Sequence, residues 1–573
     1  MDTSKIATAE CPTPTKVEEF RLWAEENAKN YTFAVFLNEM HKRFLSLYVE
    51  SGDDERAVLV ELLRLAGNRA TRLFRFKMSS PYNGNKGRRR GPTQKPSLEG
   101  MFDESNDDAG DRWSKNPSRP LVGASEQHKR IVTMPFPTYQ NGIYDFQARC
   151  PAEVKAKFDQ LNSFSGKEHT AQLEQIVKKH TPEYEKFNFN VLRNALGHLP
   201  DASRSQYFDR IFPGIVSLAK DLPGKLSHRP LVFLTPGVTL ELRRDEIACL
   251  LANAYLCTFP YRDLFTSTLP TVNFITLFSG QPGKDKRESA KVEKLKCLFA
   301  YFSKAMEFGP EGEEKVSFSK VALNEKPDWE NSQKPMKTFN IEELEGKIED
   351  FEGIQVDFAN KLIGGGVIGR GCQQEEIRFI TCPELIAARL FTEQLEDNEA
   401  LVITNFWQYS DHSGYQDDFK YEGPFTGSND GKRTLAAIDA SDFSNTNDSK
   451  LEGLWLQSED HTSRQYLKQV IDRDLNKAYT GFLCQELDQS LHIATGNWGG
   501  GSFKGDPLLK AMIQHVAASE ASRELHYYPY HDISLKEMLE GSALATRSKG
   551  TVGEAYHELL NYAKEKNPYP SAF

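Results

Sequence analysis

Apolar residues recur every three or four positions over much of the first 335 residues, which is the spacing of one helix face. Within 16–77 this spacing is carried by Phe33, Phe36, Leu37, Met40 and Phe44. The spacing therefore predicts helices across 16–77. The residues before them, 1–15, are mainly polar, and we expect them to be disordered.

The segment 78–125 has a different composition from its neighbours, because it is rich in Ser, Gly, Asn and Pro and carries the basic run Lys86–Arg90. This composition is typical of a linker. Helical spacing resumes after it, for example at Leu173–Lys179, Ile215–Leu222 and Asp245–Leu256. We therefore expect an N-terminal helical and linker region that is partly disordered (1–125), a helical accessory domain (126–335) and a third domain (336–573).

In 336–573 short apolar runs alternate with helical patterns. The expected strands are Ile354–Phe358, Leu401–Asn405, Leu435–Ala440, Leu491–Ala494 and Leu525–Tyr530. The expected helices are Glu384–Gln394 after Pro383, His461–Tyr479, and one that opens at Asp506 and Pro507. This alternation predicts an α/β fold with a mostly parallel sheet between helices.

Two glycine-rich loops follow expected strands. The first glycine loop is Gly364–Gly371 and the second is Gly496–Phe503. Glycine tolerates positive φ, so such runs let several backbone N–H groups surround one anion, such as a phosphate or diphosphate. Ligands of open α/β sheets bind beyond the carboxyl ends of the strands, so we expect both loops at one rim.

Glu375 and Glu376 come directly after the first glycine loop. Adjacent residues do not face each other on a helix, so they cannot be the facing carboxylate pair of most glycosidases. One of them is expected to transfer the proton while the other holds sugar hydroxyls. The alternative is a solvated acidic pair that caps a helix. Asp357 and Asn360 flank the preceding strand end and are equally compatible with a turn or helix cap.

The remaining candidates have less specific interpretations. Gly364, Gly366 and Gly369 match the spacing of a dinucleotide-binding loop, but five residues separate them from the strand and no acid closes the next strand. Trp498 and Phe503 can stack on a ribose or base, or fill the core. Cys372 has no histidine partner near it in the sequence, so we do not expect it to act as a nucleophile. A nicotinamide-dependent oxidoreductase is a further alternative, which an absence of NADH binding would eliminate.

The composition of the chain excludes several classes of function. The formal net charge is −10, which argues against broad capture of nucleic acid, so we expect no direct DNA binding. The 8 Cys include no CxxC pair and the 13 His no HExxH spacing, so we expect reduced thiols and no metal or other cofactor. The start of the sequence has no apolar signal segment, and the apolar stretch 247–261 is too short to span a bilayer. We expect no membrane association.

The residues around the first glycine loop resemble the signature of the poly(ADP-ribose) glycohydrolase family. The resemblance is carried by Gln355–Asn360, Gly364–Gly366 and Gln374–Phe379. It continues through Pro383–Ile386, Gln408–Ser410, Gly414-Tyr415, Asn476–Tyr479 and Thr495–Gly499, and upstream through Leu250–Ala254 and Cys257–Pro260. It covers about residues 130–573 and does not extend to 1–125. Residues 443–462 resemble an insertion.

The resemblance implies a macrodomain-like fold, which is a three-layer α/β/α sandwich with a mixed, mostly parallel sheet, joined to a helical accessory domain. It implies that Glu376 is the catalytic acid/base and that Glu375 and Asp357 are also active-site residues. The substrate contacts that it implies are Ile348 and Glu349 at the adenine, then Asn360, Gly364, Gly365, Gly366, Gln374 and Tyr415. A diphosphate loop is implied at Asn497, Trp498, Gly499, Gly500, Gly501 and Ser502, with Phe503 and Tyr530 as stacking neighbours.

The implied activity is hydrolysis of the ribose–ribose O-glycosidic bonds of poly(ADP-ribose), with release of ADP-ribose. The alternative is a macrodomain that binds ADP-ribose or its polymer without cleaving it. The resemblance further implies poly(ADP-ribose) on modified proteins as the partner, a monomeric state, a role in the DNA damage response and a location in the nucleus, the cytoplasm or both.

Overall fold

The computed structural model describes 139–140, 143–144, 169–226, 231–262, 267–281, 286–308, 315–429, 433–444, 461–483, 487–542 and 550–567. The chain divides into two units, 1–126 and 127–573, and all described residues belong to the second. The expectations for 1–125, including the helices across 16–77 and the basic run, lie outside the described residues. So does most of the insertion at 443–462.

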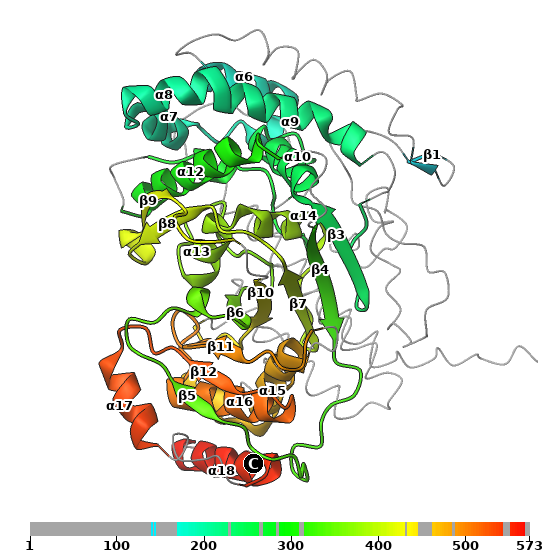
Figure 1. Ribbon diagram of the computed structural model, residues 1–573, viewed down its shortest axis with the longest axis vertical. Helices are drawn as coiled ribbons and strands as arrows, with labels where there is room; N and C mark the ends of the chain where they lie inside the picture. The colour runs from blue at the N-terminus through cyan, green and yellow to red at the C-terminus, as the bar shows by residue number, and fades with distance from the viewer. Residues whose placement is uncertain are drawn as a thin grey trace, which may run out of the picture. The chain divides into compact units, whose positions relative to one another are not determined.

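The first part of the second unit is mainly helical (Figure 1). It contains β1 (Tyr139–Gln140), β2 (Ile143–Tyr144), α6 (His169–His180), α7 (Asn190–Gly197), α8 (Asp201–Gln206), a π-helical turn (Tyr207–Ile211), α9 (Phe212–Lys225), α10 (Arg244–Tyr255), α11 (Ile275–Phe278) and α12 (Lys286–Ala305). No helix among the described residues is long and apolar enough to cross a membrane.

Eight strands form one mixed sheet in the order β3-β4-β7-β10-β6-β11-β12-β5. Their bounds are β3 (Val238–Arg243), β4 (Lys315–Ala322), β5 (Phe339–Ile341), β6 (Ile354–Ala359), β7 (Glu399–Thr404), β10 (Thr434–Asp439), β11 (Ile493–Thr495) and β12 (Leu525–Tyr527). The pairs from β10 to β5 are parallel, and those from β3 to β10 are antiparallel. The expected α/β fold with a mixed sheet is confirmed. A separate hairpin pairs β8 (Ser410–Ser413) with β9 (Lys420–Pro424).

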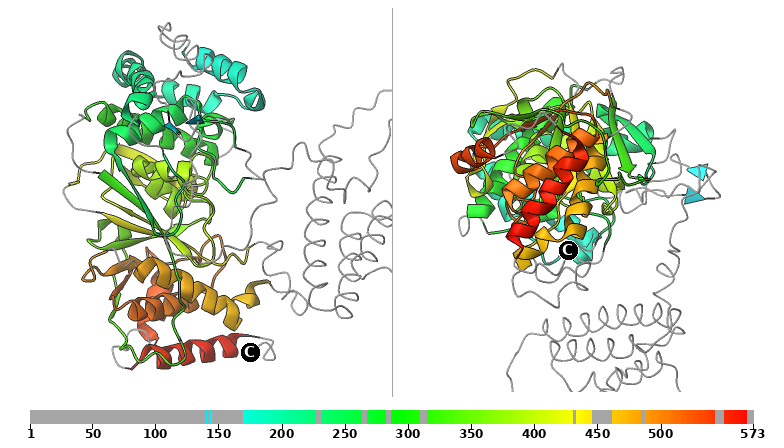
Figure 2. Two further views of the ribbon diagram at one scale, coloured as in Figure 1. Left: turned by 90° about the vertical axis from the view of Figure 1, so that its right-hand side faces the viewer. Right: turned by 90° about the horizontal axis from the view of Figure 1, so that it is seen from below.

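Helices cover both faces of the sheet (Figures 1 and 2). The helices of this part are α13 (Gln374–Thr381), α14 (Ala388–Phe391), α15 (Lys468–Leu483), α16 (Pro507–Glu520), α17 (Ile533–Gly541) and α18 (Val552–Lys566). One face carries α13 and α14 together with the helical region, and the other carries α15 and α16, with α18 outside them. Strand β10 shows the resulting alternation, because Leu435 and Ala437 join the first core while Ala436 and Ile438 join the second.

Several expected elements differ from the structure. Strands β3 and β4 lie within 126–335 and join the sheet, so this segment is not helical throughout. The helix expected at Glu384–Gln394 is a 3-10 turn (Pro383–Ala387) followed by the short α14, which ends at Phe391. The expected helix from His461 begins as a 3-10 turn and becomes α-helical only at Lys468. The domain boundary near residue 335 stays a prediction.

A buried ion pair fixes the helical region to the α/β part. Arg244 begins α10, and its Nε lies 3.2 Å from Oε1 of Glu384, which is fully buried. The same guanidinium packs 4.0 Å from the ring centre of Trp407 and donates to the carbonyl of Asn405 at 2.6 Å. Since removal of one partner leaves a buried charge, this pair couples the two parts energetically.

The parallel strands β6 and β11 are neighbours, with Ile354 opposite Ile493. The first glycine loop follows β6 and the second follows β11, so both leave the sheet at its carboxyl edge. The expectation that the two loops share one rim is therefore confirmed.

Candidate active site

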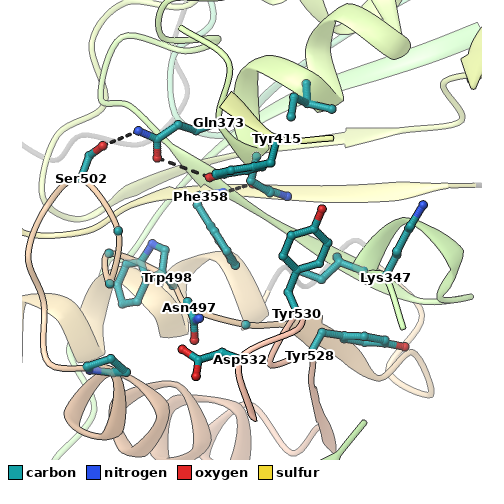
Figure 3. Close-up of a pocket in the computed structure, with 18 of the residues that line it drawn as sticks. Lys347, Phe358, Gln373, Tyr415, Asn497, Trp498, Ser502, Tyr528, Tyr530 and Asp532 are labelled. Atoms are coloured by element: carbon teal, nitrogen blue, oxygen red, sulfur yellow. Dashed lines mark hydrogen bonds between the residues drawn. The ribbon is translucent and has the colours of Figure 1, made fainter. Parts of the chain in front are cut away.

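A cavity of about 380 Å³ lies at this rim, among residues that follow β6, β10, β11 and β12 (Figure 3). Its lining includes the predicted contacts Ile348, Glu349, Gln374, Tyr415, Asn497, Trp498, Gly499, Gly500, Gly501, Ser502, Phe503 and Tyr530. The other predicted site residues, which are Asp357, Asn360, Gly364, Gly365, Gly366, Glu375 and Glu376, are not among the described lining residues. Among them, Asn360, Gly364 and Gly366 are hydrogen-bonded to Glu375 or Glu376, and the backbone N–H of Gln373, a lining residue, also donates to Glu376.

The second glycine loop forms one wall of the cavity. Gly499 has φ +72°, and a Cβ built there would lie 2.7 Å from the Cβ of Ala440, so only glycine fits. Within the described part of the chain, the amides of Gly499, Gly501, Ser502 and Phe503 donate to no backbone carbonyl. These amides are therefore available to an anion, which supports the interpretation of this loop as a diphosphate cradle.

The first glycine loop uses its amides differently. The N–H of Gly364 donates to Oε1 of Glu375 at 2.6 Å, and the N–H of Gly366 donates to Oε1 of Glu376 at 2.9 Å. The second oxygen of Glu375 accepts from the Asn360 N–H at 2.9 Å, and that of Glu376 accepts from the Gln373 N–H at 2.8 Å. In this structure the loop positions the two carboxylates, and direct contact of Gly364, Gly365 and Gly366 with substrate stays a prediction.

The two carboxylates converge on Gly365. This residue has φ +42°, and a Cβ built on it would lie 2.5 Å from Oε1 of Glu376 and 2.7 Å from Oε2 of Glu375. Glycine is therefore required here both for the backbone angle and for the close approach of the acids. Although Glu375 and Glu376 point in different directions from α13, the loop reaches both of them.

Two buried cations hold the carbonyl side of the same loop. Lys294 of α12 is fully buried, and its Nζ donates to the carbonyls of Gly366, Val367, Gly369 and Gly371. Arg389 of α14 donates to the carbonyls of Ile363 at 2.6 Å and Gly365 at 3.1 Å. With its carbonyls held from this side, the loop presents its amides to the glutamates. We name Lys294 and Arg389 the carbonyl clamp.

Asp357 lies on the face of β6 opposite Ile354 and Val356, which belong to the second core. Its side chain is fully buried, and neither oxygen accepts a hydrogen bond from the described residues. Burial, and then the negative charge of Glu376, raise the pKa of Asp357 well above its usual range. Burial and the charge of Asp357 likewise raise the pKa of Glu375. Both acids are therefore held towards their neutral forms.

Gln373 and Tyr415 close the cavity next to Glu376. The hydroxyl of Tyr415 donates to Oε1 of Gln373 at 3.4 Å, and Nε2 of Gln373 donates to the hydroxyl of Ser502 (Figure 3). Burial, with a smaller effect from Glu376, raises the pKa of Tyr415 to about 12, so its hydroxyl is a donor at neutral pH. Gly414 precedes Tyr415 and has φ +71°. Only glycine fits at this position, because a Cβ there would lie 1.9 Å from the carbonyl oxygen of Asp418.

Ile348, Glu349 and Tyr530 also line the cavity. Ile348–Asp350 is a 3-10 turn, and the side chain of Gln355 donates to the carbonyls of Glu349 at 3.1 Å and Phe351 at 2.8 Å. The ring centres of Tyr415 and Tyr530 are 6.1 Å apart and the ring planes are inclined by 56°, so the two rings contact each other. Both rings also line the cavity and offer it an aromatic surface.

Three predicted residues have additional local roles. Trp498 is fully buried, and its indole N–H donates to the Ile438 carbonyl at 2.9 Å, so its ring lines the cavity from the core. The side chain of Asn360 accepts from the Leu362 N–H at 3.0 Å and thus caps a turn. Gln374 accepts from the Phe358 N–H at 2.9 Å and donates to the Val356 carbonyl at 3.2 Å, so it is tied to β6.

The sequence did not single out several residues that the structure brings to the site. They are Gln373, Lys347, His412, Tyr528 and Asp532 in the cavity lining, and Lys294 and Arg389 in the carbonyl clamp. Gln373 occupies the N-cap of α13 and forms a capping box with Glu376, but glutamine is not a preferred N-cap residue, so the sequence carried no signal for it. Nothing in the sequence indicated the carbonyl clamp, because a single Lys or Arg in a helix is usually solvated.

The thiol of Cys372 lies beside Glu376 but is not activated. Burial raises its pKa to about 11, against the smaller opposing effect of Lys294. A neutral buried thiol is a poor nucleophile, which agrees with the expectation that Cys372 does not act as one.

Comparison with known proteins identifies relatives of both parts of the second unit. Residues 326–537 match the family model described as poly (ADP-ribose) glycohydrolase, macro domain fold, and residues 199–320 match the model of the helical domain of the same family. Together the matches cover more than half of the chain.

Individual relatives carry the same family name. "Probable poly(ADP-ribose) glycohydrolase 2" of Arabidopsis thaliana is 28% identical over 436 residues, which are 63% of this chain and 79% of the relative. "Poly(ADP-ribose) glycohydrolase 1" of the same plant is 28% identical over 445 residues, which are 64% of this chain and 80% of the relative. "Poly(ADP-ribose) glycohydrolase 2" of Caenorhabditis elegans is 30% identical over 298 residues, which are 48% of this chain and 57% of the relative. With its macrodomain, its helical region and its two glycine loops at one rim, the chain belongs to the poly(ADP-ribose) glycohydrolase family.

Proposed function

We propose that this protein hydrolyses the ribose–ribose O-glycosidic bonds of poly(ADP-ribose) and releases ADP-ribose, with Glu376 as the acid/base. The observation that carries this proposal is the fixed position of the Glu376 carboxylate, which two backbone amides hold beside Gln373 and Tyr415 at one end of the cavity. A proton donor held in place against a bound sugar is what general acid catalysis needs.

In the proposed reaction the diphosphate binds at the amides of the second glycine loop, and the adenine binds near Ile348, Glu349 and Tyr530. Glu376 in its protonated form gives its proton to the departing ribose oxygen while the anomeric carbon becomes oxocarbenium-like. The carboxylate that remains then takes a proton from the attacking water. Positioned acid–base catalysis of this kind is typically worth about 10²–10⁴-fold.

The raised pKa values of Asp357 and Glu375 are consistent with Glu376 alone transferring the proton. Two acids that are held towards their neutral forms add little negative charge to a site that must also accept a diphosphate. Glu375 is buried and tied to two amides of the loop, so we assign it to holding the loop and sugar in place. Orientation of this kind supplies much of the remaining reduction of the barrier.

The substitution Glu376→Gln tests the proposal. It keeps the shape of the side chain and removes the proton, so turnover of poly(ADP-ribose) should fall about 10²–10⁴-fold. Release of ADP-ribose is measured by chromatography and binding of ADP-ribose by calorimetry, and binding should be retained. Glu565→Gln, at an exposed position of α18, is the control with unchanged turnover.

Two results would contradict the assignment. Full turnover by Glu376→Gln would remove Glu376 from the acid/base role. If the unmodified protein binds ADP-ribose but releases none from the polymer, the alternative of a binding macrodomain without hydrolysis is correct.

A further inference from the structure

Two histidines and a glutamate converge at the amino-terminal ends of β11 and β12, outside the lining of the cavity. They are His492, directly before β11, Glu524, directly before β12, and His526 within β12. One ligand atom from each lies within 4.8 Å of the other two. All three side chains are partly exposed, so an ion in solution can reach them.

The separation of the two imidazoles suits a shared metal ion. Nδ1 of His492 and Nε2 of His526 are 3.3 Å apart. Two nitrogen ligands at about 2.0–2.1 Å from a tetrahedral Zn²⁺ ion are themselves about 3.3–3.4 Å apart. The carboxylate of Glu524 approaches the same place, since its Oε2 lies 3.7 Å from Nδ1 of His492. A modest rotation of this partly exposed side chain brings it to coordination distance.

A second carboxylate sets the tautomer of His526. Oε1 of Glu342, which directly follows β5, lies 2.6 Å from Nδ1 of His526. With the proton on Nδ1, Nε2 of His526 carries a lone pair, and this atom lies 3.3 Å from Nδ1 of His492 and 3.4 Å from Nδ2 of Asn340, which an ion would displace. Protein zinc sites commonly contain this carboxylate–histidine arrangement, in which the outer carboxylate orients the ligand and raises its basicity.

We propose that His492, Glu524 and His526 bind one Zn²⁺ ion, that Glu342 positions His526, and that water completes the coordination. Imidazole and carboxylate groups in this combination are suitable ligands for zinc. The bound ion connects β11 to β12 directly, and through Glu342 it connects both strands to β5. The site is structural in this proposal, since its three ligands do not line the cavity.

The site also has a short route to the cavity. The ring centre of His526 lies 4.6 Å from that of Phe351, which follows the 3-10 turn that supplies Ile348 and Glu349 to the cavity. Fixing His526 therefore restrains the turn. The bound ion is expected to raise the melting temperature and to tighten the binding of ADP-ribose, without taking part in bond cleavage.

Titration of the untagged, chelator-treated full chain with ZnCl₂ in a calorimeter tests the site. We expect one tight site, and a melting temperature that rises on addition of Zn²⁺. His492→Ala and Glu524→Gln should weaken this site, and Glu342→Gln should weaken it about 10–100-fold because the tautomer is no longer fixed. His198→Ala is the matched control, because this exposed histidine has Asn194 as its side-chain partner.

Cobalt gives a second readout that does not depend on stability. Co²⁺ bound by two imidazoles and a carboxylate in tetrahedral geometry produces intense visible bands, which should be absent in His492→Ala and present in His198→Ala. The proposal is overturned if the unmodified protein binds no Zn²⁺ at this stoichiometry. It is also overturned if the His492 and Glu524 variants bind as tightly as the parent, because the cluster is then only a chain of hydrogen bonds.

Discussion

Glu375 and Glu376 show how much a single residue depends on its surroundings. They are adjacent on α13, yet each accepts two backbone N–H groups from different positions. Glu375 is buried and Glu376 is partly exposed, so only the second is accessible beside the cavity. The two acids acquire different roles because the loop around Gly365 separates their environments.

Gly365→Ala tests this arrangement. The new Cβ would meet both carboxylates at a residue with positive φ, so the acids must move. Because a displacement of about 1 Å at a catalytic group can cost about 10²-fold, turnover should fall by about that factor. The measurement is kcat on poly(ADP-ribose), together with circular dichroism to verify folding.

Gly197→Ala is the control for this substitution. It lies in α7, where no heavy atom stands within 4 Å of the new Cβ, and alanine should leave turnover unchanged while stabilising the helix. Equal turnover in both alanine variants would show that the acids tolerate a Cβ at Gly365.

Because the pKa of Asp357 is raised in the folded protein, we expect the free energy of unfolding to depend on pH in an unusual way. Its folded pKa is raised, so the folded state holds more protons than the unfolded state between the unfolded pKa, about 3.9, and the folded value. The contribution of Asp357 is therefore fully present below about pH 3.9 and is lost as the pH rises towards the folded pKa.

Asp357→Asn removes this titration. The free energy of unfolding of the variant, minus that of the parent, should increase with pH above about 4, by at most about 1.4 kcal/mol per pH unit. Urea unfolding at several pH values between 5 and 8 measures the difference. A difference that does not change with pH would show that Asp357 is ionised in the folded protein.

At the scale of elements, strands were predicted better than helix ends. The runs that became β6, β7 and β10 are largely apolar and are buried along nearly their whole length, which leaves a clear signal in the sequence. The 3-10 turn at Pro383–Ala387 has the same apolar content as a helix, and the sequence does not distinguish them. Tyr530 was assigned to a strand, but it has φ +49° and lies beyond the end of β12.

The element with the largest hidden role is α12, since it contributes Lys294 to the carbonyl clamp. Lys294→Met keeps the length of the side chain and removes the donor to four carbonyls of the first glycine loop. Buried carbonyls without a donor should lower the free energy of unfolding by about 1–3 kcal/mol. The loop should also shift, with a fall in kcat of about 10–100-fold.

Hydrogen exchange separates positioning from general destabilisation. In Lys294→Met the amides of Gly364 and Gly366 should exchange faster, while those of β6 keep their protection. Lys296→Met is the control, because Lys296 pairs with Glu293 at a partly exposed position of the same helix. An unchanged kcat in Lys294→Met would mean that Arg389 alone holds the loop.

At the scale of the whole molecule, the helical region and the α/β part depend on each other through buried polar contacts. Arg244→Met should lower the free energy of unfolding by about 3–5 kcal/mol, because it leaves Glu384 buried without its cation. Urea unfolding, monitored by tryptophan fluorescence, measures this free energy. Arg204→Met removes an ion pair with the exposed Asp201 and should change the free energy of unfolding by less than about 1 kcal/mol.

A double variant distinguishes pairing from simple loss of packing. If the pair accounts for the effect, Arg244→Met combined with Glu384→Gln should be less destabilising than the sum of the two single changes. Strict additivity would show that the two side chains act independently, and the proposed energetic connection between the parts would be wrong.

The fold class, the principal strands, the shared rim of the glycine loops and the family are predictable from the amino-acid sequence, because they depend on local runs and on a contiguous motif. Only the folded chain shows which loop has amides available to an anion, which amides bind Glu375 and Glu376, and that Lys294 and Arg389 hold the first glycine loop. Tertiary structure also placed β3 and β4 in the sheet and brought His492, Glu524 and His526 together. Such contacts join residues that are distant in the chain, and their geometry exists only after the sheet has formed.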